Sequence, residues 1–159
     1  MPLKAGDKAP DFSLKVCPEG SLSTASMEGY RLLVFYKVSC PTCQLTLPFI
    51  EKLYKYYGDA VSFVGVSQDN CADTLNFMRE YGLSFTQVSD DPEYRVSIEY
   101  DVQVVPTLYL IDPSGEVSFV EESFVRSSLE SLNEELSRIA GREVNPLFED
   151  VSVPPFKAG

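Results

Sequence analysis

Residues 31–44, RLLVFYKVSCPTCQ, give the clearest indication of the fold of this 159-residue chain. Its first six residues, RLLVFY, form a nearly continuous apolar run, as expected of a β-strand that is covered on both faces. After the loop, apolar residues recur every four positions between Pro41 and Tyr57, which predicts an amphipathic helix that Gly58 ends. The sequence therefore predicts a buried strand, a short loop, and a helix that begins inside the CPTC sequence.

Strand and helix patterns alternate along the rest of the chain. Further strands are expected at 11–16, 21–22, 61–67, 85–88, 107–112 and 116–120, and further helices at 70–81, 91–100 and 127–140. Pro92 is expected at the first position of the short helix, and Ser127 or Ser128 is expected to cap the last one. This alternation predicts an α/β fold, a mixed central sheet flanked by helices with an N-terminal hairpin.

One domain is expected over residues 1–141, followed by a tail, residues 142–159. No Gly/Ser-rich linker and no internal repeat divides the first 141 residues. The tail lacks periodicity but carries five apolar residues: Leu147, Phe148, Val151, Val153 and Phe156. We therefore expect the tail to pack, either on its own domain or on a neighbouring chain.

The amino-acid composition excludes several kinds of catalytic site and several kinds of partner. The chain has no His, which excludes Ser-His and Cys-His catalytic pairs and His-ligated metals, and it has no Trp. Its net charge is −11, and residues 80–159 hold five basic and sixteen acidic side chains. No basic patch is available for phosphate groups, so neither nucleic acid nor an anionic membrane surface is expected as a partner.

The four cysteines are Cys17, Cys40, Cys43 and Cys71. No apolar signal segment follows the initial methionine, so we expect a cytoplasmic protein. In a reducing cytosol, cysteines are more often catalytic, metal-binding or incidental than disulfide-bonded. A zinc site is disfavoured because Cys17 and Cys71 are isolated in the sequence, and no metal or other cofactor is expected.

Cys40 and Cys43 have the position and spacing of a redox pair. The unpaired N–H groups and partial positive charge of a helix N-terminus favour a thiolate at Cys40. Cys43 lies one turn later on the same face, where it can attack a mixed disulfide on Cys40. Lys37 is a supporting candidate that can add positive charge, although a solvated lysine at a strand end is the favoured interpretation.

Two other segments are candidates for this site. Val105, Pro106 and Thr107 precede a strand, and a proline there can be cis and leave backbone free to pair with a bound peptide. Cys71 is expected just past a strand, at the sheet edge where α/β proteins carry active sites, so a third redox thiol is one interpretation. A buried or incidental cysteine is the favoured interpretation of Cys71, and Cys17 is expected to be inert.

These features in this order resemble the thioredoxin fold: a strand, CPTC at a helix start, Pro48 within that helix, and Val-Pro-Thr before a later strand. The opening Gly6–Leu14, GDKAPDFSL, is similar to the start of the alkyl hydroperoxide reductase/thiol-specific antioxidant (AhpC/TSA) group and of related thioredoxin-like thiol–disulfide oxidoreductases. Those proteins insert a strand–helix unit before the cis-proline strand, a place that Val61–Tyr81 would fill. The resemblance covers about residues 6–140.

The resemblance implies that Cys40 is the nucleophile and Cys43 the resolving thiol, with Pro41 and Thr42 between them. It also implies that Pro106 is a cis-proline that faces the pair.

Three positions depart from the patterns of the family. Ser39 stands where most thioredoxins have Trp, and Val34 stands where many have a buried acid that manages the proton of the resolving thiol. Lys37 stands where peroxiredoxins carry Thr or Ser, three residues before the peroxidatic cysteine, so the peroxidase pattern is not met.

The leading interpretation is a thiol–disulfide oxidoreductase that reduces or exchanges disulfides through the CPTC pair. Its expected partners are a disulfide-bearing protein or small thiol substrate and a thiol electron donor, with the oligomeric state left open. A thiol peroxidase that reduces hydroperoxides is the enzymatic alternative. A redox-sensing interaction domain without turnover is the non-enzymatic one.

Overall fold

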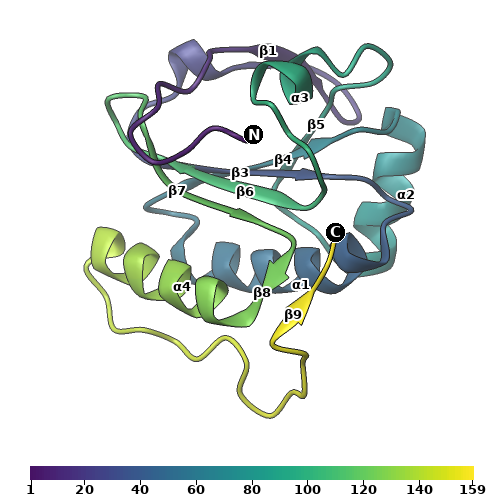
Figure 1. The fold of residues 1–159 in the computed structure, drawn as a ribbon. Coiled ribbons are helices and arrows are strands. Elements are labelled where there is room, and N and C mark those ends of the chain that lie inside the picture. Colours follow the sequence, from purple (N-terminus) through teal and green to yellow (C-terminus); the bar gives the residue numbers. More distant parts are fainter.

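The computed structural model describes residues 1–159 and contains one mixed seven-stranded sheet with helices on both faces (Figure 1). The spatial order of the strands is β2-β1-β5-β4-β3-β6-β7. Their bounds are β1 (Ser13–Val16), β2 (Ser21–Ser23), β3 (Arg31–Tyr36), β4 (Ser62–Ser67), β5 (Thr86–Ser89), β6 (Thr107–Ile111) and β7 (Val117–Glu122). The predicted α/β class and mixed sheet are confirmed.

The centre of the sheet is parallel and its edges are antiparallel. Strand β4 pairs in parallel with both β3 and β5, whereas β6 and β7 add antiparallel strands on the far side of β3. The predicted N-terminal hairpin, β1 with β2, joins the other edge because β1 pairs antiparallel with β5. This arrangement is the thioredoxin fold with an N-terminal hairpin and an inserted β4–α2 unit.

Three longer helices cover one face of the sheet and a short one covers the other (Figure 1). Their bounds are α1 (Pro41–Tyr57), α2 (Cys71–Tyr81), α3 (Arg95–Glu99) and α4 (Arg126–Ala140), with a 3-10 turn, η1, at Thr24–Ser26. The short helix α3 packs with the N-terminal segment on the face opposite α1, α2 and α4. No helix of the structure combines the length and the apolar character that a membrane span requires.

Strand β3 connects the two halves of the core, and all six of its residues are buried. Leu32, Val34 and Tyr36 point into the cluster under α1, α2 and α4, while Leu33 and Phe35 point into the cluster under α3. Successive side chains of a strand alternate between faces, so a strand with helices on both sides needs the unbroken apolar run that its sequence shows.

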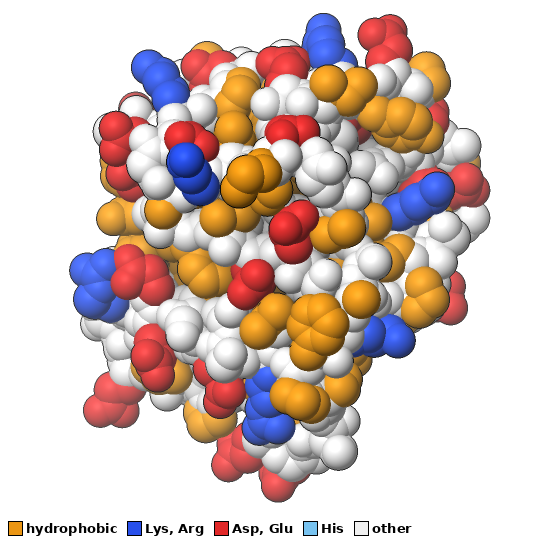
Figure 2. Space-filling view, viewed as in Figure 1, with side chains coloured by type: hydrophobic (Ala, Val, Ile, Leu, Met, Phe, Trp, Pro, Cys, Tyr) orange, Lys and Arg blue, Asp and Glu red, His pale blue; other side chains and the backbone are white.

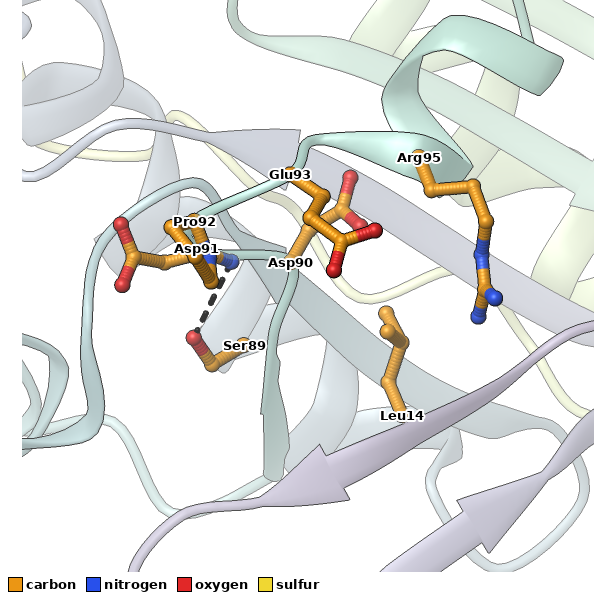
Figure 3. A pocket seen from close by; sticks show the side chains of 7 residues that line it. All are labelled: Leu14, Ser89, Asp90, Asp91, Pro92, Glu93 and Arg95. Atoms are coloured by element: carbon orange, nitrogen blue, oxygen red, sulfur yellow. Dashed lines mark hydrogen bonds between the residues drawn. The ribbon is translucent and has the colours of Figure 1, made fainter.

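Two helix starts differ from prediction. Helix α3 begins at Arg95, and Pro92 lies in the turn before it (Figure 3). The carboxylate of Asp90 accepts the N–H groups of Val96 and Ser97 and thereby caps the helix.

Helix α4 begins at Arg126 and has no side-chain cap. The predicted cap Ser128 instead donates its hydroxyl to Glu121 of β7.

The tail, residues 142–159, runs back along α4 and α1 of its own chain (Figure 1). Leu147 and Phe148 are buried in the core cluster, and the ring of Phe148 lies 4.8 Å from that of Phe49 in α1. The end of the tail forms β9 (Phe156–Lys157), which pairs antiparallel with β8 (Phe124–Val125) just before α4.

Charged side chains of both signs are spread over the face of the molecule that Figure 2 shows. Figure 2 shows acidic side chains scattered across the visible face, with fewer basic ones among them. Most ion pairs within the chain are solvent-exposed, so we expect them to contribute little to stability.

Gly65 in β4 is predicted to be intolerant of any side chain. A Cβ atom there would lie 1.8 Å from Oε1 of Gln87, the buried oxygen that accepts the Tyr36 hydroxyl at 2.9 Å. Gly65→Ala must therefore displace a satisfied buried amide, and we expect a loss of about 1–3 kcal/mol in the free energy of unfolding. Denaturant unfolding checks this, with Ser62→Ala in the same strand as the matched control. Equal stability of the two variants would contradict the prediction.

Candidate redox site

Cys40 caps the helix that the CPTC sequence begins. Strand β3 ends at Tyr36, and after a four-residue connection Pro41 occupies the first position of α1. Cys40 has extended backbone, and its Sγ accepts the N–H of Cys43 at 3.1 Å. The sulfur of Cys40 thus takes the role that a serine or aspartate oxygen has at an ordinary helix cap.

The loop before β6 lies against Cys40. Strand β6 pairs antiparallel with β3, with Phe35 opposite Thr107, so the residues before β6 meet the residues after β3. The Val105–Pro106 peptide bond is cis, as predicted for Pro106. Cys40 Sγ lies 3.5 Å from the carbonyl oxygen of Val105, to which its thiol donates.

The three residues of this loop differ in what they offer to a ligand. Val105 is half-buried, whereas Pro106 and Thr107 are buried. Thr107 is already paired with strands on both sides, and its hydroxyl donates to Val104 O at 2.7 Å. The Pro106 carbonyl accepts the N–H of Ser123 at 2.8 Å. Val105 is therefore the residue of the three whose backbone lies nearest to the thiol and to solvent.

The two thiols differ in burial and charge environment. Cys40 is half-buried, whereas Cys43 has no exposed surface. Burial raises the pKa of the Cys43 thiol far above its usual value, Cys40 raises it further, and a hydrogen bond from the Lys37 backbone acts in the opposite direction. Cys43 therefore stays protonated at neutral pH until a reaction at Cys40 changes its surroundings.

Asp69 is a residue of the site that sequence reasoning missed. It follows β4, and its carboxylate accepts the N–H of Val38 at 2.8 Å, which ties the β4–α2 connection to the segment before Cys40. Its negative charge also contributes to the raised pKa of Cys43. Since Val34 cannot supply the acid that many thioredoxins bury, Asp69 is the carboxylate that acts on Cys43 here. Its place directly after a central strand was the available signal.

Cys17 and Cys71 form a disulfide, with their Cα atoms 5.2 Å apart. Cys71 is therefore not a free third thiol and not an incidental cysteine, because it is bonded to Cys17. The expectation that structural disulfides are absent is wrong for this pair, whereas the expected chemical inertness of Cys17 stays a prediction. Strand β1 pairs antiparallel with β5, so Cys17, which follows β1, lies near the start of α2. The pairing depends on this sheet contact between residues 54 positions apart, which no local pattern indicates.

The supporting candidates Lys37, Pro41 and Thr42 differ in how far their side chains are buried. Lys37 is exposed and Pro41 is exposed at the helix start, whereas Thr42 is buried. The Thr42 hydroxyl donates to the carbonyl oxygen of Ala158, so the tail reaches the redox pair. No cluster of three or more Cys, Asp or Glu side chains in the chain has the arrangement of a metal site.

Two surface hollows differ in their position relative to Cys40 and Cys43. One of about 150 Å³ lies at the β5–α3 turn, where Figure 3 shows three acidic side chains, Arg95 and no thiol. Another, of about 290 Å³, is lined by Gln68, Val102, Gln103, Val104, Val105 and Gly159. The second hollow adjoins the cis-proline loop, so it belongs to the candidate site.

Comparison with known proteins gives consistent matches. The sequence profile of the AhpC/TSA family matches residues 5–120. The thiol-disulfide oxidoreductase ResA of Oceanobacillus iheyensis is 30% identical over 88% of this chain and 75% of its own length. The thioredoxin-like protein YneN of Bacillus subtilis is 29% identical over 72% of this chain and 69% of its own. The solution structure of a thiol:disulfide interchange protein from Bacteroides sp. superimposes with a TM-score of 0.75 at 25% identity, covering 89% of this chain and 93% of that one.

The difference between the two thiols generates a prediction. In the reduced protein at neutral pH, iodoacetamide is expected to modify Cys40 and to spare Cys43, because Cys43 is buried and its pKa is raised. Asp69→Asn keeps a side chain that can accept from Val38 but removes a charge, so the modification of Cys43 should begin at lower pH.

Peptide mapping of the alkylated cysteines against pH measures both effects. Asp73→Asn, an exposed neighbour in α2, is the matched control and should leave the profile unchanged. Modification of Cys43 as fast as Cys40 in the parent protein would contradict the assignment.

Proposed function

The chain belongs to the AhpC/TSA family and is a thiol–disulfide oxidoreductase, and we propose that Cys40 and Cys43 perform its disulfide exchange. The observation that carries this proposal is the asymmetry of the pair. The half-exposed sulfur of Cys40 caps a helix beside the cis-proline loop and accepts the backbone N–H of Cys43, whose own thiol is buried and protonated.

In the proposed reaction, the Cys40 thiolate attacks one sulfur of the substrate disulfide. The substrate S–S bond breaks, one substrate sulfur leaves as a thiolate and takes up a proton, and the other forms a mixed disulfide with Cys40. Cys43 then loses its proton and attacks Cys40 Sγ, which releases the second substrate thiol. The substrate gains two electrons, and the protein is left with a Cys40–Cys43 disulfide that a dithiol donor must reduce.

The surrounding residues support each step. The Cys43 N–H faces the sulfur on which negative charge forms and disappears during the cycle. Asp69 is a carboxylate whose charge acts on Cys43 in a chain without His, and that charge favours a protonated Cys43 before the first step. Val105 offers backbone to a bound polypeptide beside the thiol.

We propose that the protein works in an oxidising compartment. The sequence predicts a cytoplasmic protein, but the Cys17–Cys71 disulfide favours an oxidising compartment, because structural disulfides are rare in the cytosol. We propose that Cys17 and Cys71 stay oxidised while Cys40 and Cys43 cycle. Alkylation of acid-quenched cell fractions, followed by mapping of Cys71, tests this directly, and a reduced Cys71 in cells would overturn it.

Substitution of each active thiol should have a different effect. Cys40→Ser is expected to lower the rate of insulin reduction by about a hundred-fold or more, because the attacking sulfur is lost. Cys43→Ser should still attack but cannot resolve, so a mixed disulfide between Cys40 and substrate should accumulate. Non-reducing mass spectrometry identifies that species.

The double variant Cys17→Ser/Cys71→Ser is the matched control, since it removes two sulfurs outside the reaction. It should retain most of the turnover, although its stability should fall by about 2–5 kcal/mol. A parallel assay with hydrogen peroxide tests the thiol peroxidase alternative. Peroxide turnover faster than insulin turnover, with a trappable sulfenic acid on Cys40, would contradict the proposed function.

A further inference from the structure

The last four residues of the tail lie on the redox site. The carbonyl of Ala158 accepts from Thr42 of the CPTC sequence, and the N–H of Gly159 donates to Ser123 Oγ at 3.0 Å. Gly159 packs against Val105 so closely that a Cβ atom would lie 2.1 Å from the Val105 carbonyl oxygen. That oxygen is the one to which Cys40 donates.

The tail crosses the site as an added β-strand. Strand β9 pairs antiparallel with β8, with Phe156 opposite Val125 and Lys157 opposite Phe124. An extended polypeptide that adds a strand to an exposed edge binds by main-chain hydrogen bonds and needs little from its side chains. The tail therefore shows how an extended polypeptide fits over Val105 on the way to Cys40.

Two parts of the tail are held with different strength. The first is anchored: Asn133 donates to the carbonyl of Asn145 at 2.6 Å, Lys52 donates to the carbonyl of Leu147 at 3.1 Å, and Phe148 is buried. Residues 149–155 that follow are exposed, apart from the half-buried Val153.

The part that covers the site is held weakly. All four residues of 156–159 are exposed, and Phe156 retains 58% of its surface. Exposed terminal segments that bury little apolar surface open at a small free-energy cost. The end of the tail can therefore leave the site while the anchored part stays in place.

We propose that the surface formed by β8, Thr42 and Val105 is the docking site for an extended polypeptide, and that residues 156–159 of the same chain occupy it until a substrate polypeptide replaces them. This inference rests on the proposed function and adds to it a substrate class and an internal competitor. The position over Val105, where Gly159 lies, favours glycine. A side chain there must shift, because a Cβ atom on Gly159 would lie too close to the Val105 carbonyl oxygen.

Tethering makes a weak segment an effective competitor. A segment joined by a short linker has an effective concentration on the order of millimolar at its own site. A polypeptide substrate must exceed that competition, whereas a small disulfide reaches the half-exposed sulfur of Cys40 without entering the strand position. The tail is therefore expected to slow large substrates selectively.

Two variants release the tail by different means. Gly159→Val places a side chain where the Val105 carbonyl lies, and Ser123→Ala removes the acceptor of the Gly159 N–H. Val151→Ala, in the exposed part of the tail, is the matched control. All three are compared with the parent chain by amide hydrogen exchange of Lys157, by reduction of insulin and of a small aromatic disulfide, and by alkylation of Cys40.

We expect faster amide hydrogen exchange at Lys157 in both releasing variants. The kcat/KM for insulin should rise about five-fold, which corresponds to a loss of about 1 kcal/mol in the binding of the tail to the site. The kcat/KM for the small disulfide and the behaviour of Val151→Ala should match the parent. Faster amide exchange at Lys157 with an unchanged kcat/KM for insulin would overturn the inference. An unprotected Lys157 amide in the parent chain would also overturn it.

Alkylation of Cys40 tests the position of the tail independently of activity. If no variant reduces any disulfide, the proposed function fails, but the alkylation rates still test the inference about the tail. In a Cys43→Ser background, a polyethylene-glycol maleimide should modify Cys40 about five-fold faster once the tail is released, while iodoacetamide should react at equal rates. Equal rates for the bulky reagent in all variants would overturn the inference.

Discussion

The antiparallel pairing of β3 with β6 holds the two loops of the candidate redox site beside each other. One strand leads into the CPTC sequence, and the other begins directly after the cis-proline loop, so the pairing brings Cys40 and Val105 to the same edge of the sheet. Burial of every residue of β3 fixes that strand between its neighbours on both faces. The apolar run thus stabilises the core and also determines where the sulfur of Cys40 lies.

The chemistry follows from what surrounds each sulfur. Cys40 takes the cap position and remains partly exposed, whereas burial raises the pKa of Cys43 and keeps its thiol protonated at neutral pH. A chain without His must use carboxylates, water or the thiols themselves to move protons, and Asp69 is placed where it influences the buried thiol. A second pair of cysteines forms a disulfide at the β1–α2 contact, outside this cycle. In the proposed function, the four sulfurs therefore divide into a reactive pair, Cys40 and Cys43, and a structural pair, Cys17 and Cys71.

Most of the fold and the position of the CPTC pair could be predicted, because apolar periodicity and helix caps are local signals. The stretch 31–44 alone carried the strand, the loop and the helix. Long-range contacts were not predictable in this way: the partner of Cys71, the carboxylate of Asp69 beside Cys43, and the tail over Val105 depend on the packing of segments far apart in the sequence. The short helix α3 was misplaced for the same kind of reason, since its cap comes from a residue before the turn.

A redox titration shows whether Cys40 and Cys43 form and break a disulfide with each other. The protein is equilibrated in glutathione buffers of stepped potential, acid-quenched, alkylated and mapped by mass spectrometry. We expect one reversible two-electron transition that joins Cys40 to Cys43, while Cys17 and Cys71 stay bonded across the same range. Failure of Cys40 and Cys43 to form a disulfide at any potential, or a transition confined to Cys17 and Cys71, would contradict this expectation.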